Sequence, residues 1–239
     1  LRMRFRLDRE VAQAVFHFGK WLFVSSMLTF VCGQLDRIVL AKFMDMSRLG
    51  VYSIAFMLSQ VMVVFIAHIS RKILFPLYAR SAEEGVPQLR RQTVRVRLAL
   101  LSISLPPMWV LIVVGPELIA FLYDDRYHAA GWMLQLLAVG SVLAIILGPV
   151  DSVLMAAGDS FRHMVMQFVR SVVLIGAMAV GGWYYGATGV IVGFVVSQAL
   201  HYPVLAAFVR RYGVWLPWLD VGAMAVSGAV VGLGFWLKG

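Results

Sequence analysis

Long apolar stretches alternate along this chain with short groups of charged and polar residues. Each stretch is apolar around the whole circumference of a helix rather than along one stripe, which is typical of helices surrounded by lipid. A helix needs about 20 residues to cross the hydrocarbon core of a bilayer. Seven segments come close to this length or exceed it, and they predict spanning helices at residues 15–41, 49–70, 98–115, 130–157, 161–184, 187–209 and 218–237.

The composition supports a membrane protein rather than a soluble one. Of the 239 residues, 61% are hydrophobic and only 14% are charged, whereas soluble domains carry about 25% charged residues. We therefore expect an all-α, polytopic transmembrane bundle of about seven helices, with residues 1–239 forming a single transmembrane domain. The first residue is Leu1, and we expect the chain to be a fragment of a longer protein.

The basic residues predict how the chain sits in the membrane. The net charge is +9, and most Lys and Arg residues fall before the first span and between the second and third spans. Cytoplasmic loops carry an excess of Lys and Arg. We therefore expect the N-terminus and residues 77–97 to face the cytoplasm. The basic loop at 77–97 is predicted to lie on the membrane surface, bound by anionic lipid head groups rather than by nucleic acid.

No sequence motif indicates catalysis. The chain contains no HExxH, no Walker A, no GxSxG and no spaced acidic cluster of the kinds that mark metalloproteases, nucleotide-binding enzymes, serine hydrolases and metal sites. Its single cysteine, Cys32, excludes an internal disulfide and is expected to be a small, buried, apolar residue. We expect a protein that is not an enzyme and that needs no metal and no cofactor.

Polar residues within the spans are the informative ones, because a charge at the centre of a bilayer costs at least about 2.5–3.5 kcal/mol. Asp36 and Arg37 lie in the first span. As neighbours in a helix they point about 100° apart, so they need partners on other helices. Arg37 either extends toward the outer interface or contacts an anion in a central cavity.

A second polar stripe begins the fifth span. Ser160, His163, Gln167 and Arg170 recur at spacings of three and four residues, which places them on one helix face. Arg170 would lie about 15 Å into the membrane. It is expected either to face a cavity as a cation or to pair with Asp151.

Three further polar residues have two interpretations. Gln60, Gln198 and His201 could each form an interhelical hydrogen bond or could face a cavity. The complete set of candidates for a substrate-binding cavity is Arg37, Arg170, Asp36, Gln167, Gln60, Gln198 and His201.

Several stretches resemble a known family. "FGKWLFVSSMLTFVCGQLDRIVLAKFM" at 18–44, "LGVYSIAFMLSQ" at 49–60, "RKILFPLYAR" at 71–80 and "LIAFLYDDRYHAAGWMLQLLA" at 118–138 are similar to the second half of polysaccharide flippases. These are the Wzx-type transporters of lipid-linked oligosaccharides, in the MATE-like superfamily. The resemblance covers most of residues 10–210.

The resemblance implies a fold and a function. Family members have about twelve to fourteen helices in two lobes, so this chain would be the C-terminal lobe, with an N-terminal lobe as its partner. It implies that the substrate is an undecaprenyl-diphosphate-linked oligosaccharide for O-antigen (lipopolysaccharide), capsule or exopolysaccharide, flipped by alternating access. Three alternatives remain: a MATE-like cation or drug antiporter, a membrane polymerase or ligase of the same pathway, and a purely structural membrane subunit.

Overall fold

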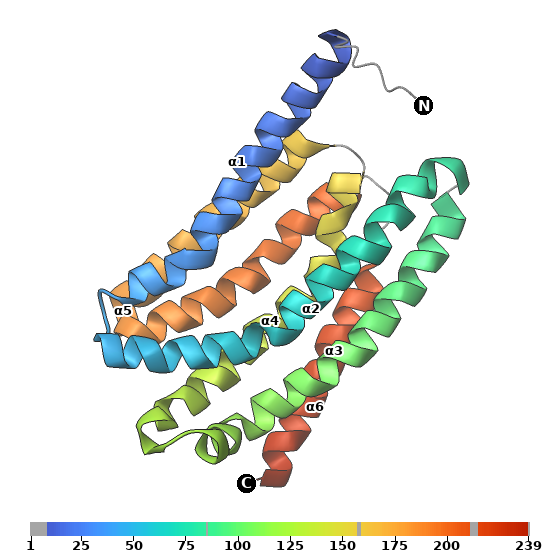
Figure 1. Cartoon of the computed structure of the whole chain (residues 1–239). Coiled ribbons are helices and arrows are strands. Elements are labelled where there is room, and N and C mark those ends of the chain that lie inside the picture. Colours follow the sequence, from blue (N-terminus) through green and yellow to red (C-terminus); the bar gives the residue numbers. More distant parts are fainter. Residues whose placement is uncertain (1–8, 85, 157–158, 211–214, 239) are drawn as a thin grey trace, which may run out of the picture.

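The computed structural model describes residues 9–84, 86–156, 159–210 and 215–238, and nearly all of them are helical (Figure 1). No strand occurs within these ranges, so the predicted all-α bundle is confirmed. The helices in chain order are α1 (Arg9–Leu40), α2 (Met46–Glu84), α3 (Val86–Leu122), the short 3₁₀ helix η1 (Asp125–Tyr127), α4 (His128–Ala156), α5 (Ser160–Val209) and α6 (Pro217–Lys238).

Helix α5 is a hairpin of two arms. Gly186 breaks the helical backbone with φ 57° and ψ −138°, a conformation that favours glycine because any side chain would clash there. The arms comprise residues 160–185 and 187–209, which match two of the predicted spans. Counting each arm, the described residues form seven long helical rods, the number that the apolar stretches predict.

Glycine lets the two arms of α5 touch. A Cβ added at Gly189 would lie 1.9 Å from the carbonyl oxygen of Gly181, and one added at Gly193 would lie 2.3 Å from the carbonyl oxygen of Ala177. Small residues allow helix backbones to approach closely in membranes, where packing rather than hydrophobic burial drives association. The arms therefore pack backbone against backbone.

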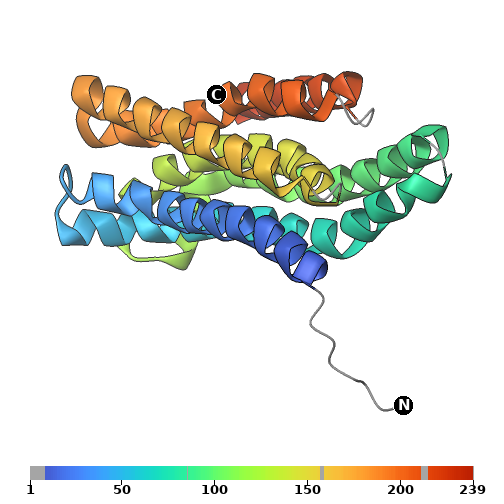
Figure 2. The same cartoon turned by 90° about the horizontal axis from the view of Figure 1, so that it is seen from above.

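Helix α4 is the centre of the bundle. It packs against α2, α3, α5 and α6, and Figure 2 shows it between a row formed by α5 and α6 and a row formed by α1 and α2. In its most apolar stretch 67% of the residues are buried, compared with 11% in α1. The other helices thus present much of their surface to the outside.

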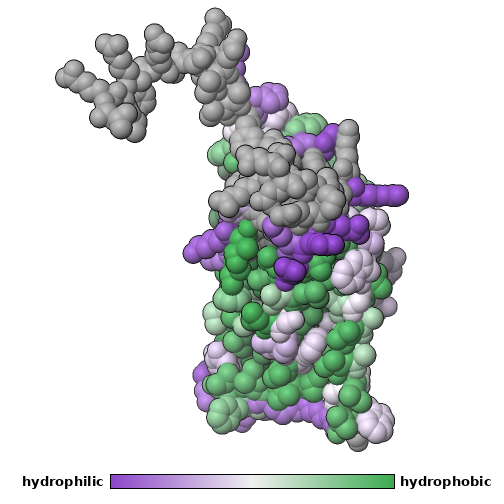
Figure 3. All heavy atoms as spheres, turned by 90° about the vertical axis from the view of Figure 1, so that its right-hand side faces the viewer, coloured by the Kyte–Doolittle hydropathy of each residue, from purple (hydrophilic) through white to green (hydrophobic). Residues whose placement is uncertain are grey.

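The outer surface is suited to lipid. Figure 3 shows a broad apolar band with hydrophilic residues above and below it, and large apolar side chains such as Trp183 (87% exposed) and Phe121 (85% exposed) lie on the outside. All six α-helices are long and apolar enough to cross a membrane. These features confirm a multi-pass membrane protein.

The structure corrects the predicted helix boundaries around residues 77–97. The described parts of this range are helical: α2 continues through Pro76 to Glu84, and α3 begins at Val86. The sequence after Pro76, "LYARSAEE", is rich in residues of high helix propensity, so the helix outlasts the apolar stretch. Apolar length alone therefore underestimated both helices.

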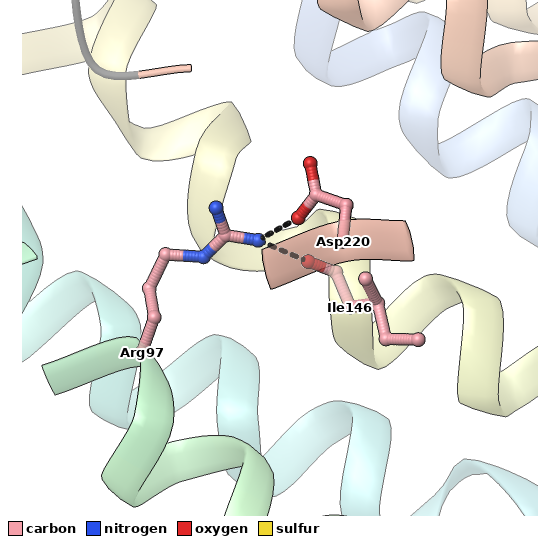
Figure 4. A network of polar contacts seen from close by, with 3 residues as sticks. All are labelled: Arg97, Ile146 and Asp220. Carbon is pink, nitrogen blue, oxygen red and sulfur yellow. Dashed lines mark hydrogen bonds and ion pairs between the residues drawn. The ribbon is translucent and has the colours of Figure 1, made fainter. Parts of the chain in front are cut away.

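One consequence is that Arg97, expected among the basic loop residues, lies in the core. Its side chain is 1% exposed, and its Nη2 lies 2.5 Å from Oδ1 of the equally buried Asp220 on α6. The same nitrogen donates to the carbonyl oxygen of Ile146 on α4, at 2.9 Å (Figure 4). This ion pair, which the sequence analysis missed, ties α3, α4 and α6 together.

We predict that Asp220→Leu lowers the free energy of unfolding by about 3–5 kcal/mol, because it leaves the Arg97 guanidinium buried without a counter-charge. The double variant Arg97→Met/Asp220→Leu should recover most of this loss. Thermal unfolding in detergent measures the stability of the single and the double variant against that of the unchanged protein. Glu117→Gln is the control, because it removes the exposed pair between Glu117 and Lys238 and should change stability little. A double variant as unstable as Asp220→Leu would contradict the prediction.

We also predict that Gly189→Ala destabilises the α5 hairpin by about 1–3 kcal/mol, because the new methyl group meets the Gly181 carbonyl. Gly176→Ala on the same hairpin is the control, since nothing lies within 4 Å of its added Cβ. Equal melting temperatures for the two variants would show that the arms do not touch as described.

Candidate functional site

A cavity of about 540 Å³ lies between α1, α2, α4 and both arms of α5. It occupies the half of the bundle that contains the end of α2 and the open end of the α5 hairpin. Its lining residues are Leu22, Ser25, Ser26, Thr29 and Phe30 from α1, Val63, Ile66, Ala67, Ser70 and Arg71 from α2, Ala144, Leu147 and Gly148 from α4, and His163, Gln167, Arg170, Gln198 and His201 from α5.

The lining combines cations with uncharged polar groups. Arg170 is partly buried, and Arg71 is exposed and donates through Nε to the carbonyl oxygen of Ala67 at 3.2 Å. The described lining residues include no Asp and no Glu. Guanidinium groups in a sheltered pocket bind phosphate or carboxylate oxygens through strong charge-assisted hydrogen bonds. The electrostatics of the cavity therefore suit an anion.

Four of the seven sequence candidates meet at this cavity. Gln167 and Arg170 come from the first arm of α5, and Gln198 and His201 come from the second arm. The two stripes of polar residues are far apart in sequence, and the turn at Gly186 brings them face to face.

The other candidates lie elsewhere. Asp36 is 2% exposed, and its Oδ2 accepts a hydrogen bond from the Tyr52 hydroxyl of α2 at 2.7 Å. Arg37 is exposed, with its guanidinium carbon 5.8 Å from the centre of the Phe56 ring. The two neighbours thus have different environments, and the partner that Asp36 needs is a tyrosine on the next helix.

Gln60 forms an interhelical hydrogen bond, one of its two expected roles. Its Nε2 donates to the Ser141 hydroxyl of α4 at 3.2 Å, which links α2 to the central helix. The side chain of Asp151, the alternative partner expected for Arg170, lies outside the described residues.

A chain of polar groups fastens α1 to the first arm of α5. The Thr29 hydroxyl donates to the Ser25 carbonyl at 2.8 Å and accepts from Gln167 Nε2 at 2.6 Å. One turn further on, the Cys32 thiol donates to the Ser171 hydroxyl at 2.9 Å, and Ser171 donates to the Gln167 carbonyl at 2.7 Å. Cys32 is therefore a half-buried donor rather than a purely apolar residue.

Sequence analysis missed the contribution of α2 to the cavity. Ser70 and Arg71 lie where the second span was expected to end and the basic loop to begin. A signal was available: no proline or glycine interrupts the chain between 51 and 75, so helical spacing could have been continued through Arg71. No group of three or more His, Cys, Asp or Glu suited to a metal occurs among the described residues.

Sequence comparisons relate the chain to proteins of polysaccharide and glycan biosynthesis. The chain is 27% identical over 234 residues to the lipopolysaccharide biosynthesis protein WzxC of Escherichia coli (strain K12), covering 93% of the chain and 47% of that protein. It is 23% identical over 235 residues to the teichuronic acid biosynthesis protein TuaB of Bacillus subtilis (strain 168), covering 93% and 48%. It is 21% identical over 232 residues to the probable low-salt glycan biosynthesis flippase Agl15 of Haloferax volcanii, covering 92% and 48%.

The chain thus spans about half the length of these curated relatives. No solved structure matches it significantly. A family model described as polysaccharide biosynthesis protein matches residues 1–131, which is more than half of the chain and includes α1, α2, α3 and η1. The chain therefore belongs to the polysaccharide biosynthesis protein family, as the sequence resemblance indicated.

Proposed function

We propose that this chain is one lobe of a transporter that moves a lipid-linked oligosaccharide from the inner to the outer leaflet of a bacterial plasma membrane. Family membership supports a role in polysaccharide biosynthesis, and the name of one relative, a probable glycan biosynthesis flippase, supports transport rather than catalysis. The observation that carries the proposal is a cavity between the helices that is lined by two arginines and uncharged polar residues, with no carboxylate among its described lining.

This cavity fits the polar part of such a substrate. A glycan attached to a lipid through a diphosphate has an anionic junction, hydroxyl-rich sugars and an apolar tail. Arg71 and Arg170 offer paired donors for the phosphate oxygens, the uncharged polar lining suits hydroxyl groups, and the tail can stay in the lipid around the apolar surface. Moving the polar part through a water-filled cavity avoids the free-energy cost of transferring its polar groups into hydrocarbon.

The position of the cavity agrees with loading from the cytoplasmic side. The basic residues Lys72, Arg90, Arg91 and Arg162 lie at the same end of the bundle as the cavity. By the positive-inside rule this end faces the cytoplasm, which is where lipid-linked sugars would enter. Transport then proceeds by alternating access, with a second lobe closing against this one.

A cation or drug exporter is less consistent with the lining. Binding a cation in a membrane calls for carboxylates in the cavity, and its described lining contains arginines and histidines instead. Asp36, which could have served, is held by Tyr52.

We predict that Arg170→Ala lowers transport of a fluorescent lipid-linked oligosaccharide in proteoliposomes roughly tenfold or more, because a charge-assisted hydrogen bond is worth about 1.5–3 kcal/mol. Insertion of the variant into the membrane should be unchanged. Arg48→Ala is the matched control, since Arg48 is exposed at the start of α2 and does not line the cavity. Undiminished transport by a correctly inserted Arg170→Ala would refute the proposal.

A further inference from the structure

Three buried side chains that line this cavity have polar atoms without hydrogen-bond partners. They are His201 (3% exposed, both ring nitrogens), Ser70 (1% exposed, its hydroxyl) and Gln167 (7% exposed, its Oε1). They come from the second arm of α5, from α2 and from the first arm of α5, and all three line the cavity. We call them the neutral shelf.

The neutral shelf carries an energetic cost unless something binds it. A buried donor or acceptor without a partner costs about 1–3 kcal/mol, and most buried polar groups are therefore paired. Unpartnered buried atoms also occur elsewhere in the described bundle, for example Thr93 Oγ1 and Ser227 Oγ, and even the paired Asp36 and Arg97 each leave one atom without a partner. What distinguishes the three residues of the neutral shelf is that they come from three helical segments and line one cavity, which has room for a ligand to complete them.

The orientation of the Gln167 amide follows from its neighbours. The Thr29 hydroxyl donates its proton to the Ser25 carbonyl, so toward Gln167 it can only accept. The amide nitrogen must therefore face Thr29, and the amide oxygen is the free atom. The shelf thus includes at least one group that only accepts hydrogen bonds.

An acceptor requires a donor on the ligand. An ionised phosphate has only acceptor oxygens, so it cannot satisfy Gln167 Oε1. A hydroxyl group both donates and accepts, as do Ser70 and, with one nitrogen of each kind, a neutral imidazole. The chemistry that matches all three groups is that of a sugar with several hydroxyls.

We propose that the neutral shelf binds hydroxyl groups of the first sugar, while Arg170 and Arg71 hold the diphosphate to which that sugar is attached. This inference rests on the proposed function and assigns the two parts of its substrate to different residues. The neutral shelf then distinguishes glycan-bearing carrier lipids from bare ones. The two arginines bind any lipid that carries a diphosphate.

The test compares the affinities of two probes for the full protein in lipid nanodiscs. One probe is undecaprenyl diphosphate, and the other is the same lipid bearing one N-acetylglucosamine. His201→Phe and Ser70→Ala should each weaken binding of the sugar-bearing probe by roughly 2- to 13-fold, the value of one hydrogen bond, and leave the bare lipid unaffected. Ser227→Ala is the matched control, because Ser227 is also buried without a partner but lies on α6, away from the cavity.

The outcomes separate the two proposals. Arg170→Gln should weaken both probes, and if it changes neither, the proposed role of the cavity in anion binding fails. If Arg170→Gln weakens both probes but the shelf variants weaken both equally or neither, the neutral shelf is refuted and the proposed function stands. Ser70→Ala removes a single oxygen atom, so it keeps the test valid even where His201→Phe does not fold.

Discussion

A polar side chain inside a lipid-embedded bundle must find a partner in the protein or a cavity that admits water. Most features of this structure follow from that constraint. Arg97 and Asp220 neutralise each other beside the central helix, and Asp36 accepts from a tyrosine on the adjacent helix. Arg170 lines a cavity together with other polar residues. Some polar groups of the bundle therefore hold helices together, others line a cavity, and Thr29 and Gln167 do both.

Much of the fold could be predicted because membrane spans are read from apolar length. The seven stretches correspond to seven rods, including the two arms on either side of Gly186. The predicted helix boundaries were wrong where helices continue past the apolar region. Helix propensity, rather than hydropathy, determines where α2 ends and α3 begins. Arg97 was consequently taken as a loop residue, although it is 1% exposed.

The candidate site could be predicted only in part. Helical spacing placed Gln167 and Arg170 on one face of a helix, and Gln198 and His201 on one face of another. Spacing says which residues share a face but not which neighbour that face meets, because rotation of each helix is set by packing. Gln60 is a glutamine within a span, like Gln167 and Gln198, but it donates to Ser141 and does not line the cavity. Even for the residues brought together, a role in binding substrate stays a prediction.

Gln167 connects the two classes of polar group. The residue lines the cavity, its amide nitrogen links α1 to α5 through a hydrogen bond to Thr29, and its buried amide oxygen has no partner. A ligand hydroxyl that donates to this oxygen polarises the amide and strengthens the hydrogen bond on its other side. Under the proposed binding of a sugar hydroxyl, occupation of the cavity would therefore tighten the contact between α1 and α5. In a transporter that alternates between two states, such a residue makes helix packing depend on whether the cavity is filled, which is the differential interaction that a ligand needs in order to shift a conformational equilibrium.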